Sequence, residues 1–435
     1  MNKVAKNAAW IIGCKMAQSL LAFIIGMLTA RYLGPSNYGL ITYAASLVAF
    51  VVPIMQLGFS NILVRELIDH PEKEGESLGS AMGLSLASSV LCIIGVVAFA
   101  AIANPNEPTT IWVCFLYSLI LIFQAIEHVN YWFQAKFLSK YTSIVSVCAY
   151  AIVSAYKIYL LATKKSIYWF SLSNALDACL IAVAALVIYY RIGGQKLSFS
   201  IETSRQMFEK SRHYIVSSMM VTVFAQTDKI MLKLMLDDAS VGYYGAAVSC
   251  AGITSFVFAA IIDSFRPSIF EGRQQSGEVF EHRLTMLYSI VIYLSLAQSV
   301  VVAVFAKLIV FIIYGEAYAP AGAALRIIVW YTTFSYLGSV RNIWVLANNQ
   351  QRHLWKINLS GALANVLLNA LLIPVLGING AALASLATQF FTNVVTGYFI
   401  KSIRPNNAIM VRGCNPKYLA ETVSKVLPNR KRGAS

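Results

Sequence analysis

Residues 32–39 read Tyr-Leu-Gly-Pro-Ser-Asn-Tyr-Gly and join two long apolar stretches of the chain. Residues 237–245 read Asp-Asp-Ala-Ser-Val-Gly-Tyr-Tyr-Gly and again lie between two apolar stretches. In both places a helix with lysine on its polar face is expected to enter a short turn, and a Tyr-Gly pair opens the next helix. The similarity of the two stretches predicts that the chain consists of two related halves. Such internal symmetry is typical of membrane transporters.

The composition of the chain places it in a membrane. Of its 435 residues, 58% are hydrophobic and 12% are charged, and the mean hydropathy is +0.65. In soluble proteins roughly a quarter of the residues are charged. Apolar stretches of about 20 residues match helices that cross a bilayer, where every backbone polar group must be bonded within the protein. We therefore predict an all-α integral membrane protein.

The apolar stretches predict about twelve transmembrane helices in two pseudo-symmetric six-helix lobes. The predicted spans cover residues 8–32, 39–57, 80–103, 110–128, 142–162, 168–190, 214–236, 241–262, 284–306, 325–347, 357–375 and 381–400. The predicted organisation is an N-terminal lobe over 1–190, a cytoplasmic linker over 191–213, a C-terminal lobe over 214–402 and a basic cytoplasmic tail over 403–435.

The distribution of Lys and Arg predicts the orientation of the chain. If the N-terminus is cytoplasmic, the inner loops hold most of the basic residues, as the positive-inside rule requires. Lys164 and Lys165 are exceptions that do not outweigh this pattern. The net charge of +15 is then explained by a face resting on anionic membrane lipids, and nucleic-acid binding is not expected. An even number of spans places both termini in the cytoplasm.

Glycine and proline residues mark the expected turns between spans. Gly34 is free to adopt a positive φ, while Pro35 ends the preceding helix and presets a tight turn. Pro374 and Gly377 have the same role between the last two spans. We interpret these residues as turn geometry that binds no ligand.

Motifs near both ends of the chain resemble one family of membrane proteins. The N-terminal motifs are Lys6-Asn7-Ala8-Ala9-Trp10, the turn at 32–39, Leu57-Gly58 and Arg65-Glu66. The C-terminal motifs are Tyr314-Gly315-Glu316-Ala317-Tyr318, Leu325-Arg326-Ile327, Asn365, Asn369 and the stretch 372–382. Their order and spacing resemble the polysaccharide-transporter branch, the Wzx-like oligosaccharide flippases, of the multidrug/oligosaccharidyl-lipid/polysaccharide exporter superfamily.

The resemblance implies a function as well as a fold. Members of this branch are two-lobed flippases of the bacterial cytoplasmic membrane that work by alternating access. The implied cargo is a polyprenyl-diphosphate-linked oligosaccharide for capsule, O-antigen or exopolysaccharide assembly, and other polysaccharide-assembly proteins are candidate partners. Transport would consist of binding and release without a covalent step, so no enzymatic activity and no catalytic residues are expected.

Two of the predicted helices carry a polar face inside the membrane. Residues spaced three or four apart share one face of a helix. In the first span this face comprises Lys15, Gln18, Ala22, Gly26 and Thr29, with Arg31 near the outer end. In the seventh span it comprises Ser218, Thr222, Gln226, Lys229 and Lys233, with Asp228 beside them. Because a charge at mid-bilayer costs about 2.5–3.5 kcal/mol, both faces are expected to line a water-filled cleft.

We hypothesise that this cleft is cationic and binds the anionic part of the cargo, since Arg and Lys are the usual partners of phosphate. The candidate contacts to phosphate or acidic sugars are Lys15, Arg31, Lys229 and Arg341, and Lys233 extends the same basic face. The candidate glycan contacts are Gln18, Gln226 and Asn342. Asp228 is expected to be a structural partner of Lys229 or of a nearby arginine. The alternative for the basic side chains is snorkelling to lipid headgroups.

No cofactor or metal site is predicted. None of the seven cysteines forms a Cys-x-x-Cys pair, and the five histidines show no i, i+4 pairing. Such cysteines are expected to be small apolar fillers. A coupling ion, H⁺ or Na⁺, remains open.

Three other functions compete with the flippase. A cation-coupled multidrug antiporter of the same fold needs acidic residues in the membrane, yet the first two predicted spans contain no Asp or Glu. A membrane glycan polymerase or glycosyltransferase needs an acid/base or metal constellation, yet the outer loops are short and no Asp-x-Asp pair exists. A lipid-II-type flippase would share the fold and often has two further spans.

Overall fold

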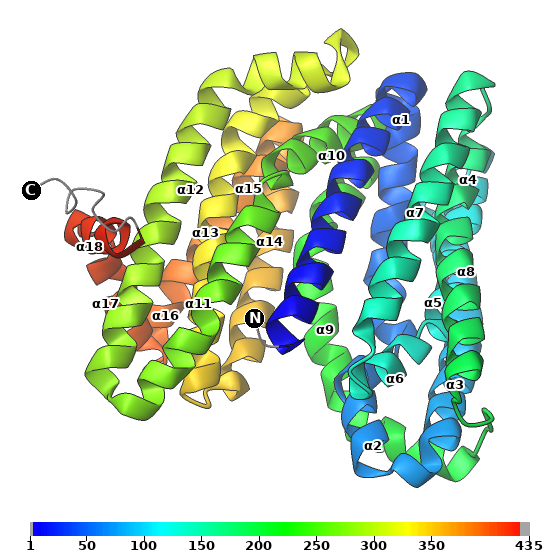
Figure 1. Cartoon of the computed structure of the whole chain (residues 1–435). Helices are drawn as coiled ribbons and strands as arrows, with labels where there is room; N and C mark the ends of the chain where they lie inside the picture. Colours follow the sequence, from blue (N-terminus) through cyan, green and yellow to red (C-terminus); the bar gives the residue numbers. More distant parts are fainter. Residues whose placement is uncertain (1–2, 427–435) are drawn as a thin grey trace, which may run out of the picture. The chain divides into compact units, whose positions relative to one another are not determined.

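The computed structural model describes the backbone of residues 3–426 and the side chains of residues 18–60 and 62–421. The side chain of Lys15 and the end of the predicted basic tail therefore lie outside the described residues. Every regular element of the described part is helical (Figure 1), which confirms the predicted all-α fold.

The first helix, α1 (Lys3–Met55), covers the first two predicted spans. Its dihedral angles are helical except at Gly34, where φ is 73° and ψ is 172°. Glycine reaches this positive φ without the steric cost of a Cβ, and the preset φ of Pro35 suits the start of the second segment. The turn predicted at 32–39 is therefore a kink between two helical segments.

The next helices supply the third to seventh predicted spans. They are α2 (Leu63–Asp69), α3 (Glu74–Ala103), α4 (Pro108–Ser118), α5 (Ile120–Ile126), α6 (Val129–Ala135), α7 (Ser139–Ala162), α8 (Ile167–Ile192) and α9 (Ile201–Met235). The fourth span consists of α4 and α5. The amphipathic sequence before the seventh span continues into it as one helix, α9.

The remaining helices supply the eighth to twelfth spans. They are α10 (Asp238–Gly252), α11 (Ser255–Gln275), α12 (Gly277–Tyr314), α13 (Ala321–Ala347), α14 (Leu354–Leu376), α15 (Ile378–Phe390), a π-helix at Phe391–Val395, α16 (Thr396–Phe399), α17 (Arg404–Gly413) and α18 (Pro416–Val426). The eighth span is bent by 41° between α10 and α11.

Length and apolar composition support the predicted number of spans. Among the described residues, eight helices are long and apolar enough to cross a membrane, and nine if α10 and α11 form one bent span. α1 contains two predicted spans in a single helix. α13 and the run from α15 to α16 occupy the positions of the tenth and twelfth predicted spans. The chain is thus an all-α membrane protein with about twelve spans.

On α3, small polar side chains are buried and large apolar side chains are exposed, as expected for a helix surrounded by lipid. On α3 the buried positions include Ser80, Ser85 and Ser89, each 0% exposed, whereas Leu91 is 70% exposed. Small polar residues let membrane helices approach closely and bond to each other. The apolar side chains that face outward on this helix match the acyl chains of a bilayer.

The chain forms two compact units, residues 1–245 (unit 1) and residues 246–435 (unit 2). The boundary lies within α10, whereas the sequence predicted that the C-terminal lobe begins at residue 214. The difference arises because α9 packs along α1 and α3. The predicted linker and the seventh span therefore belong to unit 1.

The linker from α8 to α9 is an extended strap over residues 193–200 that lies along α3. The Ser198 N–H donates to the Gly75 carbonyl at 3.2 Å. A Cβ at Gly75, Gly79 or Gly83 would overlap atoms of the strap, so these residues, spaced four apart, open a groove on one helix face. The strap holds the beginning of α9 against unit 1.

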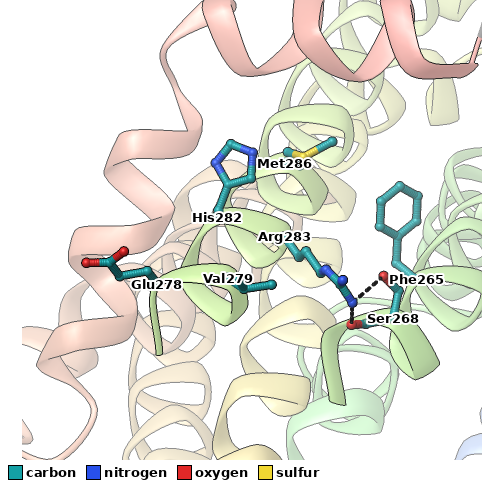
Figure 2. A pocket seen from close by; sticks show the side chains of 7 residues that line it. All are labelled: Phe265, Ser268, Glu278, Val279, His282, Arg283 and Met286. Atoms are coloured by element: carbon teal, nitrogen blue, oxygen red, sulfur yellow. Dashed lines mark hydrogen bonds between the residues drawn. The ribbon is translucent and has the colours of Figure 1, made fainter. Parts of the chain in front are cut away.

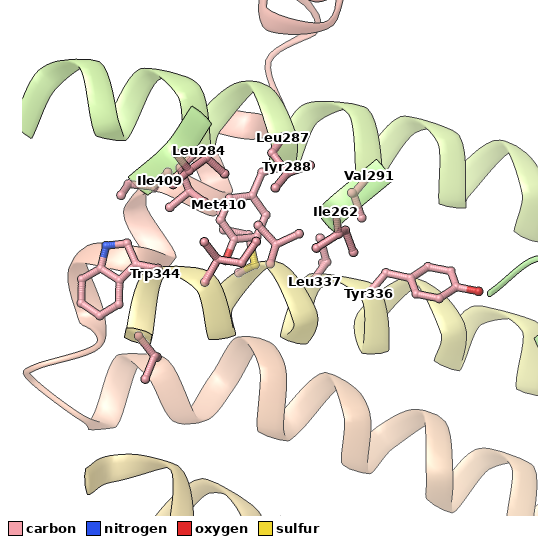
Figure 3. Packing of buried hydrophobic residues seen from close by; sticks show 14 of the residues in the cluster. Ile262, Leu284, Leu287, Tyr288, Val291, Tyr336, Leu337, Trp344, Ile409 and Met410 are labelled. Carbon is pink, nitrogen blue, oxygen red and sulfur yellow. The ribbon is translucent and has the colours of Figure 1, made fainter. Parts of the chain in front are cut away.

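The core of unit 2 joins α11, α12, α13 and α17 (Figure 3). The rings of Phe258 and Tyr336 stack with centroids 4.0 Å apart. Ile409 and Met410 of α17 are buried in the same cluster. The predicted cytoplasmic tail therefore begins with a helix that packs into the core of unit 2.

Candidate substrate-binding site

The polar face predicted for the seventh span lies on α9 in unit 1. Gln226 and Lys229 are half-buried, and Lys229 Nζ donates to Gln226 Oε1 at 3.1 Å. Asp228 and Lys233 are buried. The charged residues of this face therefore differ in how far neighbouring groups of the protein pair with them.

Asp228 connects α9 to α10 inside unit 1. The buried Tyr244 hydroxyl donates to Asp228 Oδ2 at 2.5 Å. This bond joins the helices that precede and follow the turn at 237–245. The structural role predicted for Asp228 thus includes a tyrosine partner that the sequence did not identify.

Lys233 is buried near the C-terminal end of α9, with 6% of its surface exposed. Its Nζ lies 2.5 Å from Glu107 Oε2 and 2.6 Å from Asp238 Oδ1. Hydrogen bonds from Lys233 and then from Thr110 hold the pKa of the Glu107 carboxyl below its ordinary value. The Lys233 ammonium is therefore neutralised within unit 1 by the α3–α4 loop and the start of α10.

The face predicted for the first span lies on the first segment of α1. Gln18 is half-buried and Arg31 is exposed. Next to Arg31, the Tyr32 hydroxyl donates to the Lys165 carbonyl at 3.1 Å and ties this end of α1 to the α7–α8 loop. α1 and α9 pack together, and α9 also bonds to Leu57, just after the second segment of α1. Gln18 and Arg31 lie on the first segment.

The other two predicted site residues lie on α13 in unit 2 and point to different surroundings. Arg341 is 6% exposed, and its Nη1 donates to the Thr392 carbonyl at 2.8 Å. Asn342 is exposed. Adjacent residues of a helix lie about 100° apart around its axis. The guanidinium of Arg341 can therefore be buried while the amide of Asn342 is exposed.

The sequence did not predict that the two echoing turns lie against each other. In unit 1, a Cβ at Gly39 would overlap the Asp238 carbonyl, and a Cβ at Gly242 would overlap the Pro35 carbonyl. Gly39 and Gly242 thus permit close contact between the backbones of the two turns. The recurrence of glycine in both turns was the available signal.

A second group that sequence reasoning missed joins α7 and α8. Lys157 Nζ donates to Asn174 Oδ1 at 3.2 Å, and Asp177 lies three residues further along α8. Asp177 has a buried carboxylate oxygen without a hydrogen-bond partner in the described part of the chain. The bond from Lys157 could not be predicted from the sequence because Lys157 and Asn174 belong to different spans.

Unit 2 contains an open cavity of about 640 Å³ between α11 and α12 (Figure 2). It is lined by Phe265, Ser268, Glu278, Val279, His282, Arg283 and Met286. Arg283 Nη1 donates to the carbonyl and hydroxyl oxygens of Ser268 at 2.5 and 3.2 Å, and His282 Nε2 lies 3.0 Å from Glu421. These groups already bond to neighbours, so this cavity fits an anionic cargo less well than the α9 face.

Metal-binding side chains do not gather in the described part of the chain. No group of three or more His, Cys, Asp or Glu among those residues could hold a metal ion. The described cysteines are free thiols. The candidate site remains the set of basic and amide side chains predicted on α1 and α9.

Two comparisons of sequence find similar proteins. A family model described as "Polysaccharide biosynthesis protein" matches residues 4–273. A protein of Escherichia coli (strain K12), named "Putative O-antigen transporter", is 23% identical over 424 residues, which cover 93% of this chain and 98% of that protein.

Solved structures share the fold across most of the chain. The lipid II flippase MurJ in an inward closed conformation has a TM-score of 0.69 at 12% identity and covers 96% of this chain and 93% of its own. An inward-facing multidrug resistance MATE family transporter of the MOP superfamily has a TM-score of 0.64 at 11% identity. That match covers 89% of this chain and 96% of the transporter. At such low identity these likenesses establish the fold alone.

Proposed function

The chain belongs to the polysaccharide biosynthesis protein family, and from this we propose that it is a flippase for lipid-linked oligosaccharides. The proposed cargo is a polyprenyl-diphosphate-linked repeat unit used for capsule, O-antigen or exopolysaccharide assembly. The proposed location is a bacterial cytoplasmic membrane with both termini in the cytoplasm. The O-antigen transporter name of the E. coli relative supports this assignment.

The observation that carries the proposal is Lys229, a half-buried cation inside a membrane span. The hydrogen bond from its ammonium goes to a neutral amide, Gln226, in contrast to Lys233 with its two carboxylates. A cation in a span is costly unless it faces a cavity or a partner. A diphosphate would supply the anionic partner, and the exposed Arg31 would add a second cation.

The proposed transport step is alternating access. The headgroup would bind at the polar faces of α1 and α9, while the polyprenyl chain stays in the lipid. The contact between the turns at 32–39 and 237–245 supports an outer closure that must part before release. Binding and release suffice for this cycle, and no covalent step is needed.

Lys229→Glu is the decisive variant for this proposal. The reversed charge would repel the diphosphate, so export of lipid-linked oligosaccharide should fall at least tenfold at unchanged protein level. Lys164→Glu, at an exposed lysine of the α7–α8 loop, makes the same charge change and should export normally. Normal export by Lys229→Glu would show that this lysine does not bind the cargo.

Deletion of the gene distinguishes the flippase function from the competing functions. A flippase deletion should accumulate lipid-linked oligosaccharide in the cytoplasmic leaflet, as measured by leaflet-specific labelling of the glycan. The MATE-like fold makes the multidrug antiporter the second candidate. New drug sensitivity without accumulation would favour that antiporter, while single repeat units on the outer leaflet would favour a polymerase.

A further inference from the structure

The turn that follows α12 contains a motif with no role in the proposed transport. The motif Tyr314-Gly315-Glu316-Ala317-Tyr318 joins α12 to a 3₁₀-helix at Glu316–Tyr318. The rings of Tyr314 and Tyr318 are buried, with centroids 5.2 Å apart. Gly315 adopts φ 87° and ψ 179° between them, a conformation almost restricted to glycine. The two tyrosines and the glycine therefore fix the turn, while Glu316 is exposed.

A cavity of about 410 Å³ lies between this turn and the last turns of α12. It is lined by Lys307, Phe311, Gly315, Glu316, Ala319 and Pro320. Lys307 lies where α13 crosses α12 closely, because a Cβ at Gly322 would be 3.3 Å from Lys307 Cα. The volume is typical of small-molecule sites, which measure about 300–1,000 Å³. One cavity thus brings together an ammonium of α12 and a carboxylate of the turn.

The two charged groups of this cavity are available to a ligand. Lys307 and Glu316 are exposed, and neither side chain forms an ion pair with a described residue. In the cavity between α11 and α12, by contrast, Arg283 and His282 already bond to neighbours. A ligand with one negative and one positive group would pair with both charges. A purely anionic ligand would be repelled by the carboxylate.

Apolar side chains beside the cavity indicate what else the ligand contains. Leu308, Phe311 and Ile312 of α12 are 52%, 59% and 60% exposed. The cavity lies at the C-terminal end of α12, one of the helices long and apolar enough to cross a membrane. Charged groups beside exposed apolar side chains are expected where a span leaves the hydrocarbon. These side chains match the acyl chains of a phospholipid and would be left uncovered by a glycan.

We propose that this cavity binds the headgroup of a phospholipid that carries a phosphate and a primary ammonium, as phosphatidylethanolamine does. The Lys307 ammonium pairs with the phosphate, and the Glu316 carboxylate accepts a hydrogen bond from the lipid ammonium. The acyl chains lie along Leu308, Phe311 and Ile312. All of these residues belong to unit 2, and the site does not depend on the identity of the cargo.

The test is lipid binding to the purified, delipidated full chain in detergent, measured by native mass spectrometry. Phosphatidylethanolamine should bind saturably. Phosphatidylcholine with the same acyl chains should bind about tenfold more weakly, because its methylated ammonium cannot donate to Glu316. Equal affinity for the two lipids would overturn the proposal.

Two competitors check that the ligand is a whole phospholipid. Glycerophosphoethanolamine has the headgroup without the acyl chains, so it should compete far less well than the intact lipid. A neutral oligosaccharide should not compete. Competition by glycerophosphoethanolamine at the concentration of the lipid would exclude a role for the apolar side chains. Displacement of the lipid by the oligosaccharide would assign the cavity to a glycan instead.

Matched variants locate the bound lipid. Lys307→Gln and Glu316→Gln should each weaken the binding of phosphatidylethanolamine about tenfold, because each loses one charge pair. Lys401→Gln and Glu278→Gln, at exposed positions of the same unit, should bind as the wild type does. Wild-type affinity in both variants of the cavity would place the lipid elsewhere and refute the assignment.

Glu316→Lys gives a test that does not rely on loss of binding alone. The cavity would then present two cations. Compared with the wild type, this variant should bind phosphatidylethanolamine more weakly and the anionic lipid phosphatidylglycerol more tightly. Because residue 316 is exposed, the variant should fold with an unchanged Tm. An unchanged ratio of the two affinities would show that residue 316 does not face the headgroup.

Discussion

The turns at 32–39 and 237–245 each join two helical segments, but they form by different interactions. The first is made by the backbone, with Gly34 at φ 73° followed by Pro35. The second is made by side chains. The Ser240 N–H donates to Asp237 Oδ1 at 2.7 Å, and the neighbouring Asp238 pairs with Lys233.

The two turns share a glycine at the point where they contact each other. Gly39 and Gly242 each lie where a Cβ would overlap a carbonyl of the opposite turn. The similarity of the two stretches therefore reflects the need for close packing between them. The interactions that form each turn are different. Substitutions at the shared and the unshared positions can separate these two contributions.

The largest effect is expected at the shared contact. Gly39→Ala or Gly242→Ala would force the two backbones apart, at a cost of about 3 kcal/mol for an overpacked site. If the contact closes the outer side, export should also fall at least tenfold. Thermal unfolding of the purified variants and leaflet-specific glycan labelling would measure both effects.

Gly95→Ala on α3 is the matched control. A Cβ at Gly95 meets nothing within 4 Å, and alanine is favoured over glycine in a helix by about 1 kcal/mol. This variant should therefore be slightly stabilised and should export normally. A Gly39→Ala protein that behaves like Gly95→Ala would show that the turns do not need this close approach.

The next effect concerns the ion pairs found only at the second turn. Lys233→Met would leave Glu107 and Asp238 without their shared cation. Breaking a buried pair costs 3–5 kcal/mol, but Glu107 is partly exposed and screened, so we expect a loss of about 2 kcal/mol. Adding Glu107→Gln and Asp238→Asn should restore part of that stability. The same loss in the triple variant would indicate that packing of the lysine stem matters more than its charge.

A smaller effect is expected at the backbone of the first turn. Gly34→Ala places a Cβ at φ 73°, where it meets no atom within 4 Å. With ψ at 172° this backbone region is almost restricted to glycine. The cost is then conformational strain of about 1–2 kcal/mol, less than at Gly39. Urea unfolding of the two variants side by side would test this order, and a Gly34→Ala loss exceeding that of Gly39→Ala would reverse it.

The smallest effect is a pH dependence of the second turn. The pKa of Glu107 is lowered from its ordinary 4.5, chiefly by the hydrogen bond from Lys233. A lowered carboxyl pKa adds stability that is complete above the ordinary pKa and is lost as the pH falls through the lowered one. The Tm of the wild type should therefore fall more steeply below pH 4.5 than that of Glu107→Gln. Parallel Tm curves would mean that this carboxylate contributes nothing measurable.

The sequence predicted the family and the helical architecture well, for physical reasons. An apolar stretch of about 20 residues has one stable state in lipid, and the motifs that suggested the family agree with the match over residues 4–273. The kink at Gly34 followed from the backbone freedom of glycine. The packing of α9 against α1 and α3 did not follow, because it depends on contacts between segments far apart in the sequence.

The candidate site was predicted only in part. Helical spacing correctly grouped Gln226 and Lys229, which lie within hydrogen-bond reach. The same spacing could not reveal that Lys233 is neutralised by Glu107, because Glu107 lies in a distant loop. The sequence also named both Arg341 and Asn342 as contacts to the cargo, although one is buried and the other exposed.

The sequence by itself determined that this chain is a two-part helical membrane protein with basic residues in its spans, because hydropathy and helical periodicity are local properties. Tertiary structure alone decided which charges remain available. Lys233 meets carboxylates from two other segments, Lys229 meets an amide on its own helix, and Arg341 meets a backbone carbonyl. Neutralisation depends on distances between segments far apart in sequence, and only the packed helices set those distances.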